Sequence, residues 1–224
     1  MQSDFCVTFA GMNNILQQQA QWSETVILAD ADYVDKVAFN LTVNFERMIG
    51  RRIPQADMAK WLECVALDGG LRPNTQHLSP NTQHPSPNTQ VILIRGQGKT
   101  RLENFAPSNY EDELHDKAFN GELGEFVISA YERPDSSMGS EDFFIEALQL
   151  AASREEVKRL MVIPNAEDTI IYNKVRATLR QQNHPSLLTT VYAMQPMAGG
   201  PFQQEILGYS LMAALGISAD EIKP

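Results

Sequence analysis

Three pairs of acidic residues are the side chains of this sequence best suited to carry chemistry. The pairs are Asp30 with Asp32, Glu141 with Asp142, and Glu167 with Asp168. Carboxylate oxygens are the ligands that a hard divalent cation such as Mg²⁺ or Mn²⁺ prefers, and the waters that such an ion keeps can become nucleophiles. The pattern therefore predicts a metal site, provided that the fold brings these distant carboxylates together.

The elements that must position these acids follow from the spacing of apolar residues. Short apolar runs predict strands, and apolar residues recurring at three and four predict helices. We predict strands at 25–29, 90–95, 124–131, 159–163 and 187–194. We predict helices at 33–49, from Pro54 to Gly69, at 169–182 and at 201–215, and a further helix that Ser140 caps and that contains Ala151. Strands that alternate with helices indicate an α/β fold, here a three-layer sandwich with a mostly parallel five-stranded sheet and helices on both faces.

The predicted sheet places the acidic pairs at one edge. In an open parallel sheet, ligands gather at the carboxyl ends of the strands. Asp30 and Asp32 follow the first strand, Asp142 begins the helix after the third, and Asp168 follows the fourth. We therefore expect these carboxylates to face a common crevice.

The 224 residues are enough for one sizeable domain. We predict a poorly ordered N-terminal extension at 1–23, a single α/β domain at 24–217 and a C-terminal tail at 218–224. The motif Pro-Asn-Thr-Gln occurs at Pro73, Pro80 and Pro87, so a low-complexity loop is expected at 72–90. His77 and His84 belong to this repeat and are not expected to bind metal.

Composition narrows the partners that this chain can have. Its formal net charge is −10, from 28 acidic and 18 basic residues, which disfavours RNA, although a local basic patch could still bind it. No window reaches the roughly 18 consecutive apolar residues of a membrane-spanning helix. Two cysteines support no disulfide framework, so we expect a protein of the reducing cytoplasm. A protein partner and self-association both stay open.

The sequence around the acidic residues resembles the NYN branch of the PIN-like metal-dependent ribonucleases. Residues 27–33 (Ile-Leu-Ala-Asp-Ala-Asp-Tyr) look like the first motif of that family, a strand ending in Asp. Residues 140–148 are similar to its middle acidic helix, and residues 159–168 look like its third motif. The chain is also similar to an uncharacterised bacterial family with no assigned activity.

This resemblance implies that Asp30, Asp142 and Asp168 bind Mg²⁺ or Mn²⁺, which activates water to attack an RNA phosphodiester, with Asp32 also in the catalytic site. Two features depart from the family pattern. Tyr33 stands where a polar Asn is usual, and Pro164-Asn165 replaces the small residue and Asp expected after the fourth strand. A degenerate site is therefore an alternative to an active one.

Three other interpretations of the same residues stay open. Residues 30–34 also look like the opening motif of haloacid-dehalogenase-type phosphatases, in which Asp30 would be the nucleophile and Asp32 the general acid. The acids can instead cap helices. Asp32 would then cap the helix at 33–49, and Asp168 would cap the helix at 169–182. The last interpretation is a non-enzymatic module that binds a protein or a small ligand at the edge of the sheet.

Overall fold

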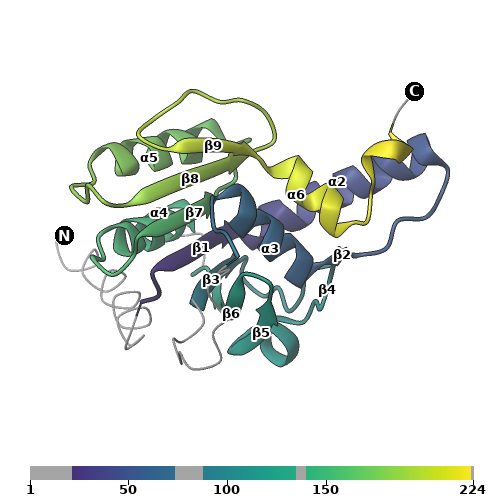
Figure 1. The fold of residues 1–224 in the computed structure, drawn as a ribbon, viewed down its shortest axis with the longest axis horizontal. Coiled ribbons are helices and arrows are strands. Elements are labelled where there is room, and N and C mark those ends of the chain that lie inside the picture. Colours follow the sequence, from purple (N-terminus) through teal and green to yellow (C-terminus); the bar gives the residue numbers. More distant parts are fainter. Residues whose placement is uncertain (1–21, 74–87, 135–139, 223–224) are drawn as a thin grey trace.

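A computed structural model describes residues 22–73, 88–134 and 140–222, and shows a twisted sheet covered by helices on both faces (Figure 1). Among these residues the sheet has seven strands, in the order β5-β6-β3-β1-β7-β8-β9. Their bounds are β1 Thr25–Asp30, β3 Asn88–Arg95, β5 Lys117–Gly121, β6 Gly124–Glu132, β7 Arg159–Ile163, β8 Leu188–Ala193 and β9 Gln203–Ile206. All neighbours in this sheet pair in parallel except β5, which forms an antiparallel pair with β6.

Five helices and a small second sheet complete the described fold. The helices are α2 Ala31–Ile49, α3 Met58–Asp68, α4 Ser140–Ala152, α5 Thr169–Arg180 and α6 Leu207–Ala214. Strands β2 Ala56–Asp57 and β4 Phe105–Ala106 form a separate parallel pair. Short helical turns lie at Tyr110–Leu114 and Ala219–Glu221. Within the described residues, no helix has both the length and the apolar character that crossing a bilayer requires.

Successive side chains of the central strands point to opposite faces of the sheet, and each face has its own hydrophobic cluster. Ile27 and Ala29 of β1 pack into a cluster with residues of α2, α3 and α6. Val26 and Leu28 pack into a second cluster with residues of α4 and α5. Burial on both faces explains why these strands are continuous apolar runs. The α/β class and the helices on both faces are therefore confirmed.

The predicted five-stranded sheet was wrong in its strand number, because two edge strands were missed. β5 is short and largely exposed, so it lacks the apolar run that marks a buried strand. β9 was taken as the start of a helix at 201–215, because Phe202, Ile206, Leu211 and Leu215 have helical spacing. In the structure β9 pairs with β8, and α6 begins at Leu207.

The order of the parallel strands creates a switch point beside β1. From β1 the chain proceeds to β3 and β6 on one side, and then crosses to β7, β8 and β9 on the other. In such sheets the crevice outside the carboxyl ends of the two strands at the switch is the usual place for a ligand. Here those two strands are β1 and β7, which pair with Ala29 opposite Ile163.

The repeat ends inside the sheet. Asn88, Thr89 and Gln90 of its last copy begin β3, so the predicted loop 72–90 extended three residues too far. Residues 74–87, which include His77 and His84, lie outside the described residues. At the N-terminal side, Trp22 is buried in the second hydrophobic cluster, beneath the Arg154 guanidinium.

Deleting one repeat unit, residues 74–80, is expected to leave the fold intact. The entropy of closing a loop grows only logarithmically with its length, so the free energy of unfolding should change by about 0.5 kcal/mol or less. Urea denaturation of the deletion variant and the parent protein measures this difference. A loss of several kcal/mol would mean that the repeat packs against the domain.

Candidate functional site

Asp30 ends β1 and also caps α2, which begins at the next residue. Its Oδ1 accepts a hydrogen bond of 3.0 Å from the backbone N–H of Tyr33. A carboxylate suits this place because it satisfies an amide that the first helical turn leaves free, and because the helix dipole favours negative charge. We expected Asp32 to cap this helix; instead Asp30 is the cap and Asp32 lies in the first turn.

Arg133 joins the two carboxylates at the end of β1. Its Nη2 lies 2.6 Å from Oδ2 of Asp32, and its Nη1 lies 3.5 Å from Oδ2 of Asp30. Lys99 approaches the other oxygen of Asp32 at 3.2 Å. Lys99 follows β3, which pairs with β1, and Arg133 follows β6, the next strand beyond β3, so the parallel sheet brings all four side chains to one edge.

Asp30 is only 4% exposed, and this burial dominates its electrostatics. Burial raises the pKa of Asp30, because removing water disfavours the charged form, and the nearby charge of Asp32 raises it further. The Arg133 guanidinium and the backbone N–H of Tyr33 act in the opposite direction. The balance leaves the pKa of Asp30 above that of an ordinary aspartate.

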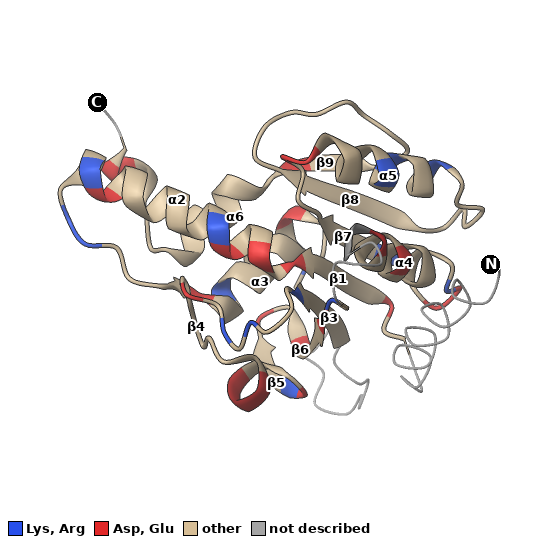
Figure 2. Ribbon diagram, turned by 180° about the vertical axis from the view of Figure 1, so that it is seen from behind, with Lys and Arg blue, Asp and Glu red and all other residues tan. Residues whose placement is uncertain are grey.

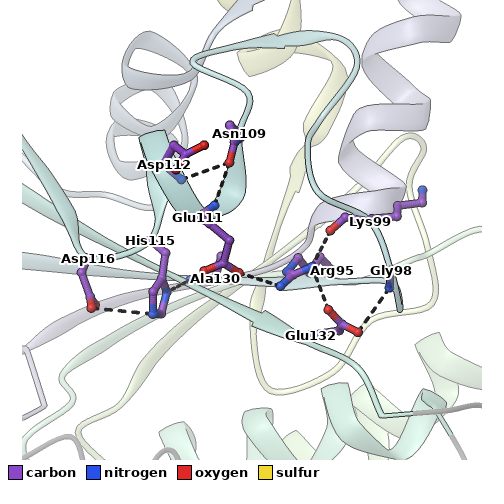
Figure 3. A network of polar contacts seen from close by, with 10 residues as sticks. All are labelled: Arg95, Gly98, Lys99, Asn109, Glu111, Asp112, His115, Asp116, Ala130 and Glu132. Carbon is purple, nitrogen blue, oxygen red and sulfur yellow. Dashed lines mark hydrogen bonds and ion pairs between the residues drawn. The ribbon is translucent and has the colours of Figure 1, made fainter.

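Arg95, at the end of β3, is the centre of a second group of polar contacts (Figure 3). Its guanidinium contacts Glu111 and Glu132, each at 2.8 Å, and also donates to the carbonyl of Lys99. Glu132 accepts a 3.2 Å hydrogen bond from the backbone N–H of Gly98. These contacts fix the turn after β3, and this turn carries Lys99 to Asp32.

The other predicted acids bind different groups. Asp168 caps α5 as expected, accepting from the backbone N–H groups of Ile170 at 2.8 Å and Ile171 at 3.3 Å. Asp142 is exposed and pairs at 2.8 Å with Lys174 of α5. The structure therefore brings Asp30 and Asp32 together, while Asp142 and Asp168 are each satisfied by α5.

As arranged, these residues do not fit a divalent ion. In the part of the chain that the structure describes, no three His, Cys, Asp or Glu side chains gather in a group that could hold a metal ion. Arg133 contacts the Oδ2 oxygens of both Asp30 and Asp32. The other oxygen of Asp32, Oδ1, is paired with Lys99. A cation at this position would have to displace an arginine.

Two neutral polar groups at the switch point contrast with these paired charges. The Tyr33 hydroxyl and Oδ1 of Asn165 are buried and form no hydrogen bond with the described residues. The pKa of Tyr33 is raised by burial and by the negative charges of Glu167 and Asp30, so the hydroxyl lies near the acidic edge and stays protonated. Buried polar atoms usually have a partner, so water or a ligand is expected here.

Sequence reasoning missed the cations of this edge. Arg95 ends β3 and Lys99 follows it, while Arg133 follows β6, the next strand of the sheet beyond β3. The signal was available: a basic residue just after a predicted strand lies at the same edge as Asp30, and a buried acid needs a counter-charge. Only the acidic residues at strand ends were considered.

Arg47, Arg51 and Arg52 form a basic cluster near the end of α2, and two of these three cations contact acids. Arg51 pairs with Glu221 at 2.6 Å, and Arg52 lies 3.3 Å from Glu46. Figure 2 shows basic and acidic positions side by side at this end of the molecule. The cluster therefore offers little of the uncompensated positive charge that RNA requires.

Comparisons with known proteins give one finding. No curated protein and no solved structure matches the chain. A family model described as "Family of unknown function (DUF6621)" matches residues 19–222, from before Trp22 to the turn that follows α6. The expectation of a family with no assigned activity is thereby confirmed, and the chain belongs to the DUF6621 family.

Proposed function

We propose that this protein is a non-enzymatic α/β module that binds a small, uncharged, polar ligand at the switch point between β1 and β7. The observation that carries this proposal is the contrast at that edge. Its charged groups, Asp30, Asp32 and Arg133, are paired with one another. Two of its buried atoms that form no hydrogen bond with the described residues, on Tyr33 and Asn165, are neutral, whereas Oδ1 of Asp32, which also forms none, is in ion-pair contact with Lys99 at 3.2 Å.

The chemistry of these atoms defines the ligand class. The Tyr33 hydroxyl can donate and accept a hydrogen bond, and Oδ1 of Asn165 can only accept. A molecule with hydroxyl or amide groups, such as a sugar or a nucleoside, satisfies both. A charged ligand would add an uncompensated charge beside ion pairs that are already balanced, and this costs free energy.

The alternative is a PIN/NYN-like ribonuclease that uses Mg²⁺ or Mn²⁺ with Asp30, Asp32, Asp142 and Asp168. The observation in its favour is that Asp30 and Asp32 converge beside the switch point. It requires Arg133 to leave the carboxylates and Asp142 to leave Lys174. A phosphatase that uses Asp30 as nucleophile is less favoured, since that carboxylate is buried and α2 begins at once, where a flap is expected.

Replacing Tyr33 with phenylalanine is expected to abolish ligand binding while making the free protein slightly more stable. The hydroxyl is buried without a described partner, so its loss removes a desolvation penalty of about 1 kcal/mol. Thermal unfolding with and without uridine, adenosine, ribose and acetamide measures both effects. We expect at least one of these probes to stabilise the parent protein but not Tyr33→Phe.

Tyr192→Phe is the matched control, because the Tyr192 hydroxyl does have a partner. It donates a 2.6 Å hydrogen bond to the Val65 carbonyl, so its loss should destabilise the protein by about 1 to 2 kcal/mol. Ligand binding should persist in this variant. Cleavage of labelled RNA with Mn²⁺ by the parent protein, together with no response to any neutral probe, would favour the ribonuclease and reject the binding module.

A further inference from the structure

We propose that Arg133 is the permanent counter-cation of the Asp30–Asp32 pair and occupies the place where a divalent ion would bind. Removing its guanidinium should then turn this pair of carboxylates into a metal site. The inference concerns the electrostatics of the edge and does not depend on which ligand the protein binds. The acidic pattern predicts a metal ion at this edge, whereas the structure shows Arg133 in contact with both carboxylates.

The contacts show that one guanidinium serves both acids. Two different nitrogens of Arg133 reach one oxygen each, Oδ2 of Asp30 and Oδ2 of Asp32. The three side chains are 17%, 5% and 21% exposed, so water screens this bridge little. Charge-assisted bonds of a planar guanidinium to carboxylates are among the strongest in proteins, and they fix geometry as well as charge.

The backbone beside the bridge is shaped for it. Asp32 leans toward the end of β3, where Gly96 provides the space. A Cβ at Gly96 would lie 2.5 Å from Oδ2 of Asp32, which is the oxygen that Arg133 contacts. Any larger residue would therefore push the carboxylate away from the arginine. Arg133 comes from β6, on the far side of β3, so its side chain reaches past this glycine.

The carboxylates of Asp30 and Asp32 need a positively charged group beside them, whichever group supplies the charge. Two carboxylates held side by side repel each other, and burying one of them without compensation is costly. Lys99 cannot take over this role, because it contacts only Oδ1 of Asp32 and is 53% exposed. Arg133 is thus the one cation among the described residues that reaches both acids.

The test is Arg133→Met, studied by thermal unfolding and by the loss of the free Mn²⁺ signal in electron paramagnetic resonance. Without metal, we expect the melting temperature to fall by about 5 °C, because the buried pair is broken. Added Mn²⁺ should restore at least half of this loss, with one ion bound per chain. The parent protein should bind no Mn²⁺ and show no shift.

Two further variants make the result specific. Asp30→Asn with Arg133→Met removes the buried acid as well, and should melt higher than Arg133→Met alone and bind no Mn²⁺. Lys36→Met breaks an exposed pair with Glu167 and should create no metal site. The double variant also keeps the test valid if Arg133→Met alone fails to fold. Recovery of folding on addition of Asp30→Asn would then report the same coupling between Asp30 and Arg133.

Three results would overturn the proposal. The first is Mn²⁺ binding by the parent protein as tight as by Arg133→Met. The second is a folded Arg133→Met protein that binds no Mn²⁺. The third is additive destabilisation by Asp30→Asn and Arg133→Met, since independent effects mean that the two groups are not coupled.

Discussion

Asp30→Ala is expected to lower the free energy of unfolding by about 3 to 5 kcal/mol. The substitution removes the N-cap of α2, which is worth about 1 kcal/mol, and takes from Arg133 its buried partner, leaving Asp32, which is 21% exposed. Urea denaturation followed by circular dichroism measures the loss. A change below 1 kcal/mol would mean that neither the cap nor the bridge stabilises the fold.

Asp30→Asn is the control that separates these two contributions. Asparagine caps helices as well as aspartate does, and Asp32 still holds Arg133 at 2.6 Å, so the loss should be smaller than for alanine. Comparable losses in both variants would assign the whole effect to the missing charge. A loss in alanine alone would assign it to the cap.

The pH dependence of stability follows from the raised pKa of Asp30. Because burial raises this pKa, the folded protein keeps the proton to a higher pH than the unfolded chain, whose value is near 3.8. Below that value the raised pKa imposes no cost, and above it the parent protein loses stability until the pH passes the folded pKa. Asp30→Asn lacks this loss, so its stability relative to the parent should improve as the pH rises from about 4.

Arg95→Leu is expected to cost about 3 kcal/mol, the second largest effect. The guanidinium is 11% exposed, contacts Glu111 and Glu132, and lies over the ring of Tyr110 at 5.4 Å. Leucine restores the packing volume but leaves both carboxylates without their partner. Denaturation measures the loss, and hydrogen exchange at Gly98 should quicken because Glu132 is no longer held in place.

Two substitutions test this explanation. Arg95→Lys keeps the positive charge but cannot contact two carboxylates and a carbonyl at once, so it should recover less than half of the loss. Glu111→Ala removes a partner that is 65% exposed and should cost about 0.5 kcal/mol or less. A large effect of Glu111→Ala, with a small one for Arg95→Leu, would contradict the central place of Arg95.

The central strands and most helices could be predicted because burial leaves a direct mark on sequence. β7 was predicted with its observed bounds, since each residue of the run 160–163 packs on one face or the other. The edge strands left no such mark. β9 has polar residues at its start and an apolar spacing that also suits a helix, so pairing with β8, a long-range contact, decides its conformation.

The site was only half predictable for a similar reason. Their position after β1 identified Asp30 and Asp32, because the end of a predicted strand already places them at the carboxyl edge of the sheet; the strand order of the structure puts the switch point there. What each carboxylate binds depends on side-chain direction. Asp168 turns to its own helix amides and Asp142 to Lys174, and local spacing cannot distinguish these choices from a shared metal ion.

The last copy of the repeat has a consequence for how this chain tolerates changes in length. Asn88, Thr89 and Gln90 enter β3 opposite Thr25 and Val26 of β1, so the copy nearest the sheet supplies a fixed alignment of strands. Gain or loss of whole seven-residue units by slippage during replication always leaves the same three residues at that point. Such a tract can vary between related genes without shifting any residue of the sheet from one face to the other.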